Sequence, residues 1–376
     1  MKETSMRRSA IAASLLLATS IPALAGSLDA LRDSLDHLPA TLMFEDRGDL
    51  AYFIDIRAVL ALSPGEGEAP PYMRLMHGAQ IPALESLQYS APAEWEAKAG
   101  TTLDQVRYFT GYGRPPDVYS FWGLADEAAA TEMIVALEGL GFESAAAGVV
   151  GNGEPLRMDP AKRNPADPWR TGIGAAQFAA AKGSNIVQTG TPQTAMLAAA
   201  QQPGLSENAI IETALAGLDQ SVGDNTVVQA LVISPLFGMA GIDHGALLSG
   251  SPDIEATKKP IEEQMAALDQ GIPPYLGGIA ADVQGEQPGV DIALTYPDCD
   301  SAEDAVGKIA ARWADMAGDT AQGNVSTTTV EGVDGLCAAT FSVTINSDGV
   351  DQNPAYRALI EPMFRGQAGV LQIGAS

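Results

Sequence analysis

Residues 185–234 read NIVQTGTPQTAMLAAAQQPGLSENAIIETALAGLDQSVGDNTVVQALVIS, and this stretch decides the fold that we expect. A short apolar run opens it, and Thr191-Pro192 then supplies an N-cap and a first-turn proline for an alanine-rich helix. Pro203-Gly204 ends that helix, and apolar residues at helical spacing predict a second helix before the turn at 223–225. The apolar run 227–233 follows as a strand. Most positions here have a packing or capping role, and none has an evident chemical one.

The strand at 227–233 matches an earlier apolar strand at 50–56, and a second unit is also repeated. In VYSFWGLADEAAATEMIVALEGLGF (118–142) a strand, an acidic cap and a helix follow one another. The strand 290–296 leads in the same way into a capping box at 300–303 and a helix. The sequence therefore predicts an α+β protein.

We expect two pseudo-repeated halves of mostly antiparallel sheet with helices packed on one face. Residues 26–225 form the first half and residues 226–376 the second. The pattern leaves open whether the halves share one sheet or form two domains.

The amino terminus has the features of a secretory signal peptide, residues 1–25. Basic residues open the chain, the apolar run 10–18 follows, and Ala23-Leu24-Ala25 provides an A-x-A cleavage site after Ala25. A membrane anchor is the weaker interpretation, because a spanning helix needs about 20 apolar residues. The sequence predicts a periplasmic or secreted protein without a membrane span.

The chain of 376 residues carries a formal net charge of −26. An acidic surface repels nucleic acid and anionic lipid, and it favours cationic partners. The simpler interpretation is that the charge keeps an exported protein in solution. No nucleic-acid partner is expected.

Two cysteines occur, Cys299 and Cys337. An even number of cysteines in an exported protein indicates a disulfide. Cys299 follows the predicted strand 290–296, and Cys337 lies near the start of another strand-like run, so the pair can form if those strands are neighbours. A metal or redox role is disfavoured, because the sequence has no C-x-x-C.

The segments AGTTLDQVRYFTGYGRPPDVYSFWGLADEAAATEMIVALEGLGF (99–142) and NIVQTGTPQTAMLAAAQQPGLSENAIIETALAGL (185–218) resemble exported bacterial proteins of unknown function, the DUF3352-like type. In that group a Gly-x-Pro-Pro turn, here Gly113 to Pro116, precedes a strand and a helix. The resemblance covers residues 92–233. It implies an exported α+β fold and transfers no catalytic residue.

The common hydrolase signatures are missing from the sequence. No histidine lies in H-E-x-x-H, and no serine lies in G-x-S-x-G or S-x-x-K. A site assembled only in three dimensions stays open, since catalytic triads are defined by geometry. The best candidate base is His244, with Asp243 as a nearby carboxylate, and an exported hydrolase built on them is our alternative function. An ordinary loop histidine is the simpler interpretation.

Metal and cofactor motifs are also weak. Met73, Met76 and His77 could bind copper(I), but the two methionines also form one apolar helix stripe. Acidic residues at 298–304 and 346–351 could bind Ca²⁺, but helix capping and a turn explain them. The sequence predicts no metal and no cofactor.

An aromatic segment surrounds the 113–116 turn, and its strand 118–123 has apolar residues on both faces, which is typical of a central strand. Tyr112 and Arg114 are the residues expected to stay exposed at the turn. Our leading hypothesis is a non-catalytic exported protein that binds a small molecule or an envelope protein through Tyr112 and Arg114. A structural subunit of an envelope assembly is a third possibility and predicts a large apolar surface patch.

Overall fold

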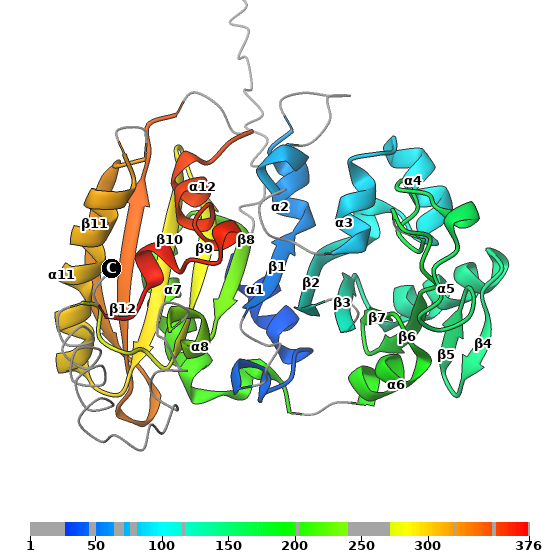
Figure 1. Cartoon of the computed structure of the whole chain (residues 1–376), viewed down its shortest axis with the longest axis horizontal. Coiled ribbons are helices and arrows are strands. Elements are labelled where there is room, and N and C mark those ends of the chain that lie inside the picture. The colour runs from blue at the N-terminus through cyan, green and yellow to red at the C-terminus, as the bar shows by residue number, and fades with distance from the viewer. Residues whose placement is uncertain are drawn as a thin grey trace, which may run out of the picture.

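The computed structural model describes residues 27–44, 50–63, 71–75, 81–114, 117–170, 172–200, 203–239, 271–318, 321–347 and 351–374. One long antiparallel sheet crosses the width of the molecule, and helices lie on it along its length (Figure 1). The predicted signal peptide and the residues Asp243 and His244 lie outside the described residues.

The strands form a single sheet in the order β11-β12-β10-β9-β8-β1-β2-β3-β7-β6-β5-β4. Their bounds are β1 Leu50–Asp55, β2 Val106–Arg114, β3 Asp117–Leu124, β4 Glu143–Ala146, β5 Val149–Gly151, β6 Phe178–Lys182, β7 Asn185–Thr189, β8 Thr226–Ile233, β9 Gly277–Gln284, β10 Pro288–Tyr296, β11 Asn324–Glu331 and β12 Cys337–Thr344. The α+β class and the antiparallel sheet are confirmed.

The first strand of each half lies at the centre of the sheet. There β1 pairs with β8 in antiparallel register, with Phe53 opposite Ala230. From this pair the strands continue outward as β2-β3-β7-β6 on one side and as β9-β10-β12-β11 on the other. The two halves therefore share one plan and one continuous sheet, which answers the question that the sequence left open.

The helices cover both faces of this sheet, so the expectation of a single covered face was wrong. Their bounds are α1 Ser27–Asp36, α2 Ile56–Ala61, α3 Pro82–Leu87, α4 Pro92–Ala99, α5 Glu127–Gly139, α6 Pro192–Ala200, α7 Ala209–Val222, α8 Pro235–Gly238, α11 Cys299–Met316 and α12 Pro354–Ile360. Helices α1, α6 and α7 lie on one face, and the others lie on the opposite face.

The side chains of β10, which point alternately to the two faces of the sheet, explain why helices cover both faces. Ile292 and Leu294 pack with Trp313 of α11, whereas Ala293 between them packs with Leu215 and Leu218 of α7. A strand that is apolar at consecutive positions exposes apolar surface on either side, and each side must be buried. The sequence had this signal in the unbroken apolar runs of its strands.

The hairpin between β2 and β3 is tighter than the expected turn at 113–116, because Gly113 and Arg114 still belong to β2. The strand β2 continues through Gly111 and Gly113 to Arg114, and Gly111 lies opposite Ser120 in β3. A Cβ atom at Gly111 would lie 2.8 Å from the Tyr119 carbonyl oxygen, and Gly113 has a φ of +91°. These glycines therefore permit close strand approach rather than a wide turn.

Two irregular segments also pack against the sheet. Leu42–Phe44 form a 3₁₀ turn, η1, in which Leu42 and Met43 are buried. The segment 148–170 is mostly exposed between 153 and 165, but it contains β5 and ends near the buried Trp169.

Cys299 and Cys337 are joined by a disulfide, with their Cα atoms 5.0 Å apart. Cys337 pairs with Tyr296 at the end of β10, and Cys299 begins α11. The bond therefore ties the first turn of α11 to β12. The strands β10 and β12 are neighbours, which is the condition that the sequence set for this pairing.

Candidate functional site

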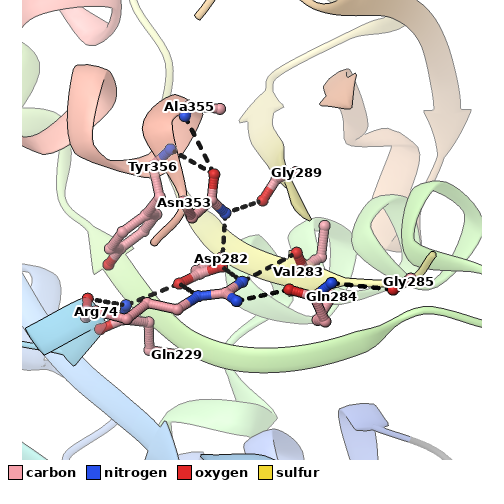
Figure 2. Close-up of polar contacts among 10 residues, drawn as sticks. All are labelled: Arg74, Gln229, Asp282, Val283, Gln284, Gly285, Gly289, Asn353, Ala355 and Tyr356. Atoms are coloured by element: carbon pink, nitrogen blue, oxygen red, sulfur yellow. Dashed lines mark hydrogen bonds and ion pairs between the residues drawn. The ribbon is translucent and has the colours of Figure 1, made fainter. Parts of the chain in front are cut away.

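A cluster of buried polar side chains joins parts of the chain that are far apart in the sequence (Figure 2). Arg74 comes from the 3₁₀ turn η2 (Tyr72–Leu75), Gln229 from β8, Asp282 from β9 and Asn353 from the N-cap of α12. Each of the four is at most 5% exposed. The cluster connects η2 of the first half to the sheet and a helix of the second half.

The Asp282 carboxylate has no acceptor position left for chemistry. Arg74 Nε donates to Asp282 Oδ2 at 2.9 Å, Gln229 Nε2 donates to the same oxygen at 2.9 Å, and Asn353 Nδ2 donates to Oδ1 at 2.7 Å. Arg74 Nη2 donates to Oδ1 as well. Four bonds saturate a carboxylate, whereas a base, nucleophile or metal ligand needs a free lone pair. The cluster is therefore a structural ion pair.

A cavity of about 630 Å³ opens beside this cluster, between the end of α11 and α12. Its exposed charged residues are Arg357, Arg365, Glu361 and Asp351. Arg365 Nη2 donates to Glu361 Oε1 at 2.6 Å, so one arginine is already neutralised. Because two cations and two carboxylates balance there, the cavity selects no charged class of ligand.

A second cavity of about 790 Å³ lies in the first half of the sheet, next to α3. Its walls are mainly apolar and come from α3, the start of β3 and two loops: Pro82, Val118, Leu156, Met158, Gly172, Ile173, Ala175 and Ala176. Its polar side chains are Ser120, Gln177, Gln188 and Glu85. An apolar cavity with a few polar groups is the usual form of a small-molecule site.

The floor of this cavity is polar and held in place. Ser120 of β3 and Gln188 of β7 lie opposite each other in register, and each is 1% exposed. Gln188 Oε1 accepts a hydrogen bond from Trp122 Nε1 at 2.9 Å, and Gln188 Nε2 donates to the Pro168 carbonyl at 2.7 Å. Trp122 stacks on Trp169 with the ring centroids 5.0 Å apart. The orientation of the Gln188 amide is thus fixed by the core beneath it.

The rim of the cavity exposes three large apolar side chains. Leu156, Met158 and Ile173 are 62%, 63% and 55% exposed. Leu156 also has a φ of +57°, a left-handed conformation that costs a non-glycine residue about 1–2 kcal/mol. Exposed apolar side chains around a concave surface indicate a binding site, and strained backbone often accompanies one.

Glu85 is the one ionisable side chain among the residues that line this cavity. It lies on α3 one turn after Pro82, while Ala83, Leu84, Ser86 and Leu87 are buried in the core behind them. Partial burial raises the pKa of the Glu85 carboxyl, and no salt bridge to it occurs within the described residues. A carboxylate at an apolar cavity, with no described basic side chain in a salt bridge to it, is available to a ligand.

Of the two predicted binding residues, Tyr112 lies away from this cavity. Tyr112 is 7% exposed and stacks on Tyr119 with the ring centroids 4.6 Å apart, so its expected exposure was wrong. Its side chain packs on the face of α1 and α7, whereas the cavity lies on the face of Trp122. Arg114 ends β2 at the hairpin. A binding role for either residue stays a prediction.

The cavity residues were missed because no motif marks them. A polar residue at the same level in two adjacent buried strands, Ser120 beside Gln188, was one available signal. The other was the apolar content of Leu156, Met158 and Ile173 in a segment otherwise rich in glycine, proline and asparagine. Both signals depend on strand pairing and loop placement, which local periodicity does not give.

Within the described residues, no group of three or more His, Cys, Asp or Glu side chains could hold a metal ion. None of the helices in this part of the chain combines the length and hydropathy that crossing a membrane requires. Comparisons with family models, with curated proteins and with solved structures gave no match to this chain.

Proposed function

We propose that this chain is an exported binding protein without catalytic activity, which takes an apolar or amphipathic small molecule into the cavity over Ser120 and Gln188. The observation that carries the proposal is the combination of apolar walls, a fixed polar floor and an exposed apolar rim. The volume of about 790 Å³ falls within the range of ~300–1,000 Å³ that is usual for ligand cavities.

The rim gives the binding its expected driving force. Leu156, Met158 and Ile173 each expose more than half of their surface. A bound molecule would remove part of this apolar surface from water, at roughly 25 cal/mol per Å² of area buried. Met158 adds adaptability, because its unbranched side chain repacks easily around ligands of different shape.

The proposed export rests on two features. The amino terminus has the basic, apolar and A-x-A parts of a signal peptide, and the Cys299–Cys337 disulfide is of a kind that persists in oxidising compartments. The lack of a catalytic role is supported by the described lining residues, which include Glu85 but no histidine, cysteine or lysine. Acid–base or nucleophilic catalysis commonly needs such a pair.

A titration with N-phenyl-1-naphthylamine, a neutral apolar fluorescent probe, tests the proposal. We expect saturable binding to the mature protein at a single site. A Cβ atom at Gly172 meets no atom within 4 Å, so Gly172→Trp should fold normally and fill the cavity. We expect this variant to lose at least about tenfold in probe affinity.

Gly307→Trp is the matched control. Gly307 lies on the exposed side of α11, far from the cavity in the sheet, and a Cβ atom there also meets nothing within 4 Å. It should bind the probe like the unmodified protein. Absence of saturable binding, or equal affinities for the two tryptophan variants, would contradict the proposed site.

A further inference from the structure

The Glu85 carboxylate makes this cavity sensitive to the charge of a ligand, which its apolar walls alone would not. Helix α3 buries Ala83, Leu84, Ser86 and Leu87, so Pro82 and Glu85, which are three residues apart, share the side that lines the cavity. Residues i and i+3 of a helix lie on one face. The carboxylate is therefore held at the cavity by an anchored helix.

Within the part of the chain that the structure describes, no basic side chain balances the charge at this position. The described residues that line the cavity include no lysine, arginine or histidine, and none of the salt bridges among them involves Glu85. By contrast, four acidic residues elsewhere on the surface, Glu94, Glu154, Asp304 and Glu361, each have a lysine or arginine nitrogen within 2.7 Å. Glu85 stands among the apolar residues of the cavity instead, with part of its side chain exposed to solvent.

Resting on the proposed function, we infer that the cavity is selective for cationic amphiphiles, molecules with an apolar body and a protonated amine or similar group. The apolar body lies between Leu156, Met158 and Ile173, and the cation pairs with Glu85. An anionic amphiphile would place like charge beside the carboxylate, and a neutral one would leave it unpaired. The amide of Gln188 and the hydroxyl of Ser120 accept or donate hydrogen bonds at the floor.

Competition against bound N-phenyl-1-naphthylamine tests this selectivity with three ligands of equal chain length, decylamine, decanol and decyl sulfate, all below their micellar concentrations at pH 7.5. We expect decylamine to displace the probe about five- to tenfold more effectively than decanol, which is the size of effect of a partly exposed ion pair. Decyl sulfate should bind more weakly than decanol.

Glu85→Gln isolates the role of the carboxylate, since it keeps the shape and the hydrogen-bonding capacity of the side chain. It should retain probe and decanol binding and reduce the preference for decylamine to about twofold or less. Glu132→Gln, on the exposed side of α5, is the control for the general attraction of an acidic protein to cations. It should keep the full preference.

The outcomes separate this inference from the function on which it rests. Equal binding of decylamine and decanol to the unmodified protein, or a preference that survives Glu85→Gln, overturns the selectivity and leaves the cavity as a ligand site. A preference that Glu132→Gln reduces equally also overturns it. Failure of the probe itself to bind defeats the proposed function together with the inference.

Discussion

Arg74 and Asp282 are 208 residues apart in the sequence, yet the guanidinium of one donates two hydrogen bonds to the carboxylate of the other in the protein interior. Gln229 and Asn353 complete the carboxylate's coordination (Figure 2). Each half of the chain contributes to this cluster, so it specifies how η2 and α12 sit on the shared sheet.

Loss of the Asp282 charge should destabilise the protein strongly. Asp282→Ala removes the carboxylate that accepts two hydrogen bonds from the buried Arg74 guanidinium, and loss of one partner of a buried ion pair typically costs about 3–5 kcal/mol of unfolding free energy. Asp304→Ala removes the half-exposed partner of Lys308 and should cost less than about 1 kcal/mol. Urea unfolding of both variants checks the difference. Similar losses for the two would mean that the buried pair does not stabilise the fold.

Removal of the disulfide should weaken the second half. A Cys299→Ala/Cys337→Ala variant should lose about 2–4 kcal/mol of unfolding free energy, because the unfolded chain gains freedom in a loop of sequence separation 38. Reductant should lower the stability of the unmodified protein to the same value and leave the alanine variant unchanged. A reductant effect on the variant would show that another process is being measured.

The buried carboxylate of Asp291 should make stability depend on pH. Burial raises its pKa from 3.8 to about 6, although the Ser342 hydroxyl donates a hydrogen bond to it that opposes this shift. Because the pKa of Asp291 is higher in the folded state than in the unfolded state, protonated Asp291 stabilises the fold fully below pH 4, and this contribution is lost as the pH rises through 6. Between pH 4 and pH 7.5, the unfolding free energy of Asp291→Asn should therefore rise by about 2 kcal/mol relative to that of the unmodified protein.

Urea unfolding of the variant and of the unmodified protein is compared at each of these two pH values. The difference between the two proteins removes the contribution that the other acidic groups make to the pH dependence of stability. Asp224→Asn, in the exposed turn after α7, provides the control and should show no pH-dependent difference. A constant difference between Asp291→Asn and the unmodified protein would rule out the raised pKa as the cause.

The left-handed backbone at Leu156 should lower the stability of the folded protein, while the Leu156 side chain contributes to ligand binding. Leu156→Gly and Leu156→Ala both remove the apolar side chain, but only glycine adopts a φ of +57° without strain. We expect Leu156→Gly to be more stable than Leu156→Ala by about 1 kcal/mol in thermal unfolding. Both should bind N-phenyl-1-naphthylamine a fewfold more weakly. Unchanged probe binding in both would remove Leu156 from the site.

The sequence by itself determined the elements with strong local signals. Helix α7 follows from apolar residues at helical spacing, and Asn208 is its N-cap. Helix α11 is capped by Asp298, two residues before the predicted capping box at 300–303. The strands β8, β9 and β10 follow from apolar runs between turns, and the repeated order of strand, cap and helix gave the two halves. These features depend on propensity and periodicity, which act over a few residues.

Only the tertiary structure decided how these elements combine. That the halves share one sheet depends on the pairing of Phe53 with Ala230, and that Tyr112 is buried depends on stacking with Tyr119 across a hairpin. The cavity requires Ser120, Gln188 and Glu85 to meet from three elements. Contacts between residues distant in the chain arise from packing and loop closure, and the local free energies that a sequence pattern reflects do not specify them.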